Sequence, residues 1–208
     1  MFARLRPALR HPWAKTVLAL ILLAPLVYLI WGAATDALGP NPAEALIRST
    51  GEMALRCLCL TLAVTPVRIL SAWAEWARFR RMMGLFSFGY ALTHLLCYAW
   101  LDMGLEWTDI ADDLGKRPFI MVGMMAMMLL LLLAATSFNA AIRWLGAKRW
   151  QWLHRFVYLA VCLGLLHFYW KRASKNNLDD VFVYGVIVAL LLAWRVWHRW
   201  RGRMRAAA

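Results

Sequence analysis

The sequence predicts an all-α integral membrane protein built as a bundle of six transmembrane helices. Hydrophobic residues make up 63% of the 208 residues and charged residues only 17%, whereas soluble proteins have about 45–50% and about 25%. A chain this apolar cannot cover its own surface with polar groups. A soluble enzyme, a disordered protein and a soluble nucleic-acid-binding domain are therefore excluded, in spite of the net charge of +13.

Six stretches are long and apolar enough to cross a bilayer, which takes roughly 20 residues at a rise of 1.5 Å. They are residues 13–34, 45–70, 82–103, 119–138, 150–170 and 178–197, joined by short connections within one expected domain, 1–208. The apolar run of the first stretch exceeds the roughly 7–15 residues of a secretory signal, so it is read as a span. Pro25 should kink it. In the second stretch, Glu52 and Arg56 lie one helical turn apart and are expected to pair with each other.

The distribution of charge along the chain predicts which way the bundle is oriented. Arginine and lysine gather in the N-terminal arm, around residues 68–81, around residues 143–155 and in the tail from Arg195 onward, while acidic residues gather in the loop over residues 101–116. Cytoplasmic loops carry the excess of basic residues in membrane proteins. Both termini are therefore expected in the cytoplasm.

Three histidines fall inside the predicted spans: His94 in the third, and His154 and His167 in the fifth. Ionisable residues inside a membrane mark functional sites by default, and neutral imidazole is a common axial ligand of haem iron. For any one of them, a hydrogen bond between helices is the alternative. His154 and His167 are separated by about 20 Å along the helix and about 140° around it, so they cannot ligate one iron together. His94 must pair with one of the two.

The expected positions of the three histidines across the membrane favour His167 slightly as the partner of His94. The small residues that precede each histidine favour it more. Small residues at helical spacing precede both: Gly84, Ser87 and Ala91 before His94, and Ala160 and Gly164 before His167. Such stripes leave room either for a flat porphyrin or for close packing of two helices.

Several motifs in combination resemble the MsrQ (YedZ) family of haem-binding membrane subunits, over nearly the whole chain. The motifs are Arg80-Arg81-x-x-Gly84-Leu85, Leu92-Thr93-His94, Leu145-Gly146, Lys148-Arg149-Trp150-Gln151-x-Leu153-His154 and His167-x-x-Trp170. The wider resemblance is to the ferric reductase-like transmembrane domain, shared with the NADPH oxidases.

The resemblance implies an electron-transfer subunit in the bacterial inner membrane that carries haem b and flavin mononucleotide. Such subunits pass electrons from respiratory quinol, or from a separate reductase, to a periplasmic molybdenum-containing partner, MsrP, which reduces methionine sulfoxide in oxidised proteins. The chain has no GxGxxG fingerprint for NAD(P)H. Five basic residues could hold the flavin phosphate or a lipid headgroup, although positive-inside topology explains the same charges: Arg78, Arg80, Arg81, Lys148 and Arg149.

Relatives in the wider group commonly stack two haems between two pairs of histidines. Here Arg80 stands fourteen residues before His94, where the inner ligand would be expected. The resemblance thus implies one outer haem held by His94 and His167. It leaves His154 without a partner, and this residue could serve a different way of binding haem, a flavin or a quinone.

Two other functions fit the same residues. One is a stand-alone ferric or quinone reductase of the same fold. The other is a non-redox transporter or assembly protein, in which the histidines line a polar path or cross-link helices. A haem spectrum in the purified protein separates the redox functions from the non-redox one.

Overall fold

The computed structural model describes residues 5–173, 176 and 178–207, and nearly all of them are helical. Among these residues, six helical segments are long and apolar enough to cross a membrane. They are α2 (Trp13–Ala34), α3 (Pro42–Ser71), Ala74–Asp102 with α4 (Arg80–Cys97) inside it, α6 (Pro118–Ala135), Ala147–Ala173 with α9 (Val157–Ala173) inside it, and Asp179–Gly202 within α10 (Asp179–Ala207). The described residues contain no strand. The predicted all-α architecture with six transmembrane helices is confirmed.

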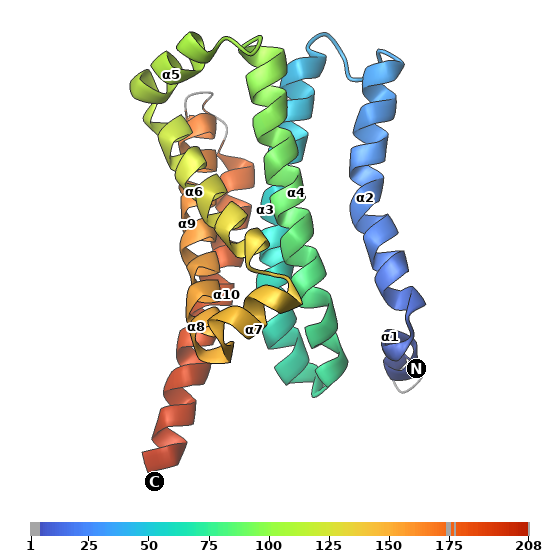
Figure 1. Cartoon of the computed structure of the whole chain (residues 1–208), viewed down its shortest axis with the longest axis vertical. Helices are drawn as coiled ribbons and strands as arrows, with labels where there is room; N and C mark the ends of the chain where they lie inside the picture. Colours follow the sequence, from blue (N-terminus) through green and yellow to red (C-terminus); the bar gives the residue numbers. More distant parts are fainter. Residues whose placement is uncertain (1–4, 174–175, 177, 208) are drawn as a thin grey trace.

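The long helices run side by side along the molecule, and both ends of the chain lie at the same end of the bundle (Figure 1). The short helix α5 (Trp107–Lys116) and the connection between α2 and α3 lie at the opposite end. The helices α7 (Asn139–Leu145) and α8 (Ala147–Leu153) connect α6 to α9 in the half nearer the termini. The end of the bundle that holds both chain ends is called the terminal end, and the opposite end is called the α5 end.

The ends of the helices follow from local sequence chemistry. The Asn41 side chain accepts a hydrogen bond from the Glu44 N–H at 3.0 Å, and Pro42 occupies the first turn, so α3 starts three residues earlier than predicted. The fourth span ends at Ala135, before the predicted residue 138, and the Thr136 hydroxyl donates to the Leu132 carbonyl at 2.7 Å.

The fifth span is not the single regular helix that its apolar run suggests. A short 3-10 helix, His154–Phe156, separates α8 from α9. The tighter turn interrupts the regular α-helical hydrogen-bond pattern beside His154. The third span is also composite, because Ala74–Phe79 is a 3-10 helix and Tyr98–Asp102 a π-helical turn on either side of α4.

The helix α3 lies between two apolar clusters and contributes to both. With α6, α9 and α10 it encloses Leu62, Ala160 and Val161, which are almost completely buried. With α2 and α4 it encloses Cys57 and Tyr90. In the most apolar 18-residue stretch of α3, half of the residues are buried in the protein, compared with 17% in that of α2. The central helix is thus the span with Glu52 and Arg56, of which the Glu52 side chain is 17% exposed and that of Arg56 51%.

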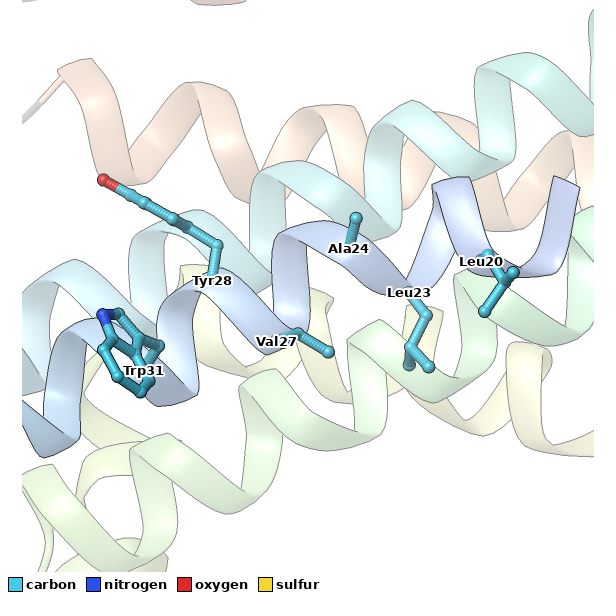
Figure 2. Close-up of a pocket in the computed structure, with 6 residues that line it drawn as sticks. All are labelled: Leu20, Leu23, Ala24, Val27, Tyr28 and Trp31. Carbon is cyan, nitrogen blue, oxygen red and sulfur yellow. The ribbon is translucent and has the colours of Figure 1, made fainter. Parts of the chain in front are cut away.

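The helix α2 stands apart from the other spans (Figure 1). One side of it carries an open apolar groove lined only by its own residues, with Tyr28 and Trp31 at one end (Figure 2). A polar contact ties this helix to the bundle: the Tyr90 hydroxyl of α4 donates to the Leu22 carbonyl at 2.6 Å. Pro25 lies one turn beyond and leaves this part of the helix with one backbone donor fewer.

Replacing Tyr90 by phenylalanine should loosen α2. The Leu22 carbonyl would lose its hydrogen bond from α4 in a buried site, and the free energy of unfolding should fall by about 1 kcal/mol. Thermal unfolding in detergent measures this loss. Tyr28→Phe is the matched control, because the Tyr28 side chain is 70% exposed and should tolerate the change. Equal effects of the two substitutions would show that Tyr90 does not hold α2 in place.

Candidate functional site

The structure brings the imidazole rings of His94 of α4 and His167 of α9 next to each other. Their ring centres are 6.1 Å apart and their planes are nearly perpendicular, at 83°. Both lie in the half of the bundle nearer the α5 end, because each is close to the end of its helix on that side. The two residues come from different helix pairs, since α4 packs chiefly on α3 and α9 chiefly on α6.

Each imidazole is held by a backbone carbonyl of the neighbouring helix. Nδ1 of His94 lies 2.7 Å from the Ile47 carbonyl of α3, and Nδ1 of His167 lies 2.7 Å from the Phe119 carbonyl of α6. A carbonyl oxygen can only accept, so both Nδ1 atoms carry the hydrogen. Both Nε2 atoms therefore keep a free lone pair. This is the tautomer in which a histidine binds a metal through Nε2.

The separation of the two rings fits two axial ligands of one metal ion. A metal–nitrogen bond of about 2.0 Å and a ring centre roughly 1 Å beyond the nitrogen put two opposed imidazole centres about 6 Å apart. The observed separation is 6.1 Å. In the described part of the chain no cluster of three or more histidine, cysteine or acidic side chains could hold a metal. A pair of imidazoles is the donor set that suits a haem, whose porphyrin supplies the other four ligands.

A charged network lies directly beside the histidine pair. Glu52 follows Gly51 on α3 and accepts from Arg172 of α9 at 2.9 Å and from Arg56 at 3.3 Å. Arg172 also pairs with Asp180 of α10 at 2.9 Å, and Arg56 donates to the Tyr184 hydroxyl at 2.7 Å. The expected pair of Glu52 and Arg56 is present, but the sequence did not indicate Arg172. The network joins α3, α9 and α10 around the site.

His154 lies apart from the other two histidines and has partners of its own. Its Nε2 is 3.2 Å from the Thr136 hydroxyl, and its ring stacks on Trp150 with 4.1 Å between ring centres. Thr136 gives its one hydroxyl hydrogen to the Leu132 carbonyl, so it accepts from His154. Trp150 in turn donates to the Thr136 carbonyl at 2.8 Å. These contacts anchor the turn between α8 and α9.

The basic residues at the terminal end divide into two groups. Arg78 donates to the Leu9 carbonyl at 2.8 Å and to the Arg10 carbonyl, which anchors α1 (Leu5–Arg10), and Arg81 donates to the Asn139 side chain at 2.9 Å. Within the described residues no side-chain hydrogen bond or ion pair engages the other three: Arg80, Lys148 and Arg149. Arg80 is also within electrostatic range of His154.

Arg195 differs from the other cations of the predicted tail. Arg195 is only 8% exposed, and its guanidinium donates to the Leu62 carbonyl at 2.6 Å and to the Leu191 carbonyl at 3.1 Å. It also stands over the ring of Tyr158, 5.3 Å from the centre. This arginine therefore belongs to the interior of the bundle, where it links α10 to α3.

Comparison with known proteins gives consistent matches. Residues 50–165 match the family model described as ferric reductase like transmembrane component. A protein of Polaromonas naphthalenivorans is 57% identical over 192 residues, 92% of this chain and 88% of the relative. Proteins of Ralstonia nicotianae (46% identical, 90% of this chain and 87% of the relative) and Bordetella pertussis (47%, 92% and 93%) are similar over the same extent. All three are named protein-methionine-sulfoxide reductase heme-binding subunit MsrQ.

Arg172→Gln should destabilise the protein far more than loss of a surface ion pair. The Arg172 side chain is 12% exposed, and its removal leaves the carboxylate of Glu52, 17% exposed, with Arg56 alone. Breaking such a pair should cost about 3 kcal/mol of unfolding free energy. Lys116→Gln is the matched control, because Lys116 and Asp112 are both at least 70% exposed; its cost should be about 0.3–0.5 kcal/mol. Chemical or thermal unfolding in detergent compares them, and similar losses would contradict the structural role of Arg172.

Proposed function

This chain belongs to the MsrQ family of heme-binding subunits of protein-methionine-sulfoxide reductase, and from that membership we propose that it is a b-type haem electron-transfer subunit. The electrons come from the respiratory quinone pool or a separate reductase. They leave to a periplasmic molybdenum-containing MsrP-like protein, which reduces methionine sulfoxide in oxidised proteins. The chain lies in the bacterial inner membrane with both termini in the cytoplasm, so the α5 end faces the periplasm.

The single observation that carries this proposal is the facing pair His94 and His167. Their ring centres are 6.1 Å apart, and both Nδ1 atoms are committed to carbonyls, which leaves both Nε2 atoms for iron. Haem iron held in this way takes up and releases one electron at a time. Reduction of a sulfoxide to a thioether consumes two electrons and two protons and releases water. Two single-electron deliveries are therefore needed for each methionine repaired.

The position of the histidine pair suits the exit of electrons toward the periplasm. His94 and His167 lie in the half of the bundle nearer the α5 end. His154 lies thirteen residues before His167, about 20 Å nearer the terminal end. The apolar residues of α3, α6 and α9 fill the layer between them and keep water from this part of the bundle.

The entry of electrons is proposed at the terminal end. Arg80, Lys148 and Arg149 are exposed there and are suited to a phosphate, either of flavin mononucleotide or of a lipid headgroup. Arg78 and Arg81 are less suited to it, because they hold α1 and α7 in place. His154, which contacts Thr136 and Trp150, lies within electrostatic range of Arg80.

His94→Ala and His167→Ala should each abolish stable haem binding, because each removes one of the two axial bonds to the same iron. His154→Ala should retain most of the haem. The measurement is haem content by pyridine haemochrome, with the Soret band of each purified variant made in haem-replete cells. His198→Ala is the control, since His198 is exposed and stacks on Trp194. A colourless wild-type protein would refute the proposed function, and equal haem loss in all three site variants would refute the pairing.

The acidic residues near α5 should speed the encounter with the electron acceptor. Asp112 and Asp113 are engaged by Lys116, Arg117 and Tyr98. The other three acidic residues of the segment 101–116 are exposed: Asp102, Glu106 and Asp109. Their replacement by asparagine and glutamine should slow electron transfer to the partner several-fold at low salt and little at high salt, because complementary charge acts on association and is screened. Stopped-flow reoxidation over a range of ionic strength tests this, and a rate independent of salt in the wild type would contradict it.

A further inference from the structure

Each of the two facing histidines lies against a glycine of the helix that holds it. A Cβ atom built on Gly51 of α3 would lie 2.9 Å from Nδ1 of His94, and one on Gly123 of α6 would lie 2.7 Å from Nδ1 of His167. In both cases the three nearest atoms belong to the imidazole alone. Gly89 of α4 has nothing within 4 Å of the same position. Neither imidazole could stay where it is beside a larger residue.

The two glycines occupy the same register relative to the carbonyl that accepts from each histidine. Gly51 is four residues after Ile47, and Gly123 is four residues after Phe119. In an α-helix the residue four positions on donates its own N–H to that carbonyl, and its Cβ leans back toward the helix N-terminus. A side chain at position 51 or 123 would therefore cover the carbonyl oxygen. Because glycine has no side chain, the carbonyl oxygen can accept from the imidazole Nδ1–H in addition to the backbone N–H of its own helix.

We infer that Gly51 and Gly123 are positioning residues for the two axial histidines. Each glycine lets an imidazole approach the helix backbone, so that Nδ1–H reaches the carbonyl and Nε2 keeps its lone pair for a metal. This inference rests on the proposed function for its consequence at the haem. The geometry itself occurs twice, on two separate helix pairs, with the same spacing and the same 2.7 Å hydrogen bond.

The expected consequence at the haem is a weaker and displaced ligand in the alanine variants. A hydrogen bond from Nδ1 to a carbonyl increases the basicity of the imidazole, which stabilises the oxidised metal. Gly51→Ala and Gly123→Ala must push the ring away or lengthen that bond. The reduction potential should rise, and part of the haem should become high-spin and bind carbon monoxide when reduced. The effect should be larger for Gly123→Ala, because the Cβ built there lies 2.7 Å from the imidazole, compared with 2.9 Å at Gly51.

The first test uses the full-length haem-loaded protein in detergent. Spin state by absorption and electron paramagnetic resonance, a redox titration, and carbon monoxide binding are measured for the wild type and both variants. We expect several-fold more carbon monoxide-reactive haem in Gly123→Ala than in the wild type. Gly89→Ala is the matched control and should match the wild type. If both variants keep the wild-type spin state and potential, the positioning role is overturned while the proposed function stands.

The second test needs no haem and therefore separates the inference from the proposed function. In the haem-free protein, Gly51→Ala should lower the midpoint of thermal unfolding by roughly 3 °C or more, because its Cβ collides with the His94 ring. In the His94→Ala background the ring is gone, and the same substitution should have no cost or be stabilising, since alanine favours helix over glycine. Gly123→Ala with His167→Ala gives the parallel cycle.

The cycles also settle the case in which an alanine variant fails to fold. If Gly51→Ala misfolds because of the imidazole, adding His94→Ala restores folding, and adding His154→Ala, at a distant site, does not. An equal loss in all backgrounds would overturn the inference, because the glycine would then be required by the packing of helices and not by the histidine. A wild type that binds no haem but shows the coupling would refute the proposed function and retain Gly51 and Gly123 as positioning residues for their histidines.

Discussion

The hydrogen bond from an imidazole Nδ1 to a helix carbonyl is the interaction on which the rest of this site depends. Inside a bilayer no water is available to accept the ring hydrogen, so a partner must come from the protein. A carbonyl already used within its own helix has a second lone pair, and it accepts without any further polar side chain. The tautomer of His94 and of His167 follows from this choice of acceptor, and with it the free lone pair on each Nε2.

The same need for internal partners explains the polar residues elsewhere in the bundle. Ser87 donates to the Ala54 carbonyl, Tyr90 to the Leu22 carbonyl and Arg195 to the Leu62 carbonyl, each between two helices. Charged residues in the apolar layer follow the same rule, because Glu52 is shared by Arg172 and Arg56. Polar groups therefore fix which helices are neighbours, and the apolar clusters around α3 provide the bulk of the packing.

Sequence reasoning succeeded where one helix is sufficient to decide the outcome. The six spans follow from the length of apolar runs. Rise per residue favoured His167 only slightly as the partner of His94, and the structure places the two ring centres 6.1 Å apart. Sequence reasoning failed where the answer depends on a lateral neighbour. Nothing in the local sequence connects the Ile47 carbonyl to His94 or Arg172 to Glu52. The break at His154 was also missed, since a 3-10 turn leaves the apolar pattern unchanged. Single glycines inside apolar spans, as at positions 51 and 123, are a signal that could have been sought.

The division of the histidine pair between two helix pairs has a consequence for how the protein is made. The α3–α4 pair, with His94, leaves the ribosome before the α6–α9 pair, with His167, because synthesis runs from the N-terminus. The residues that hold the first imidazole are thus all synthesised while its counterpart is still untranslated. In the proposed function, haem binding is then a late event of biogenesis, because it needs both histidines. A molecule that shows the red colour of bound haem is therefore one whose chain has been inserted as far as α9.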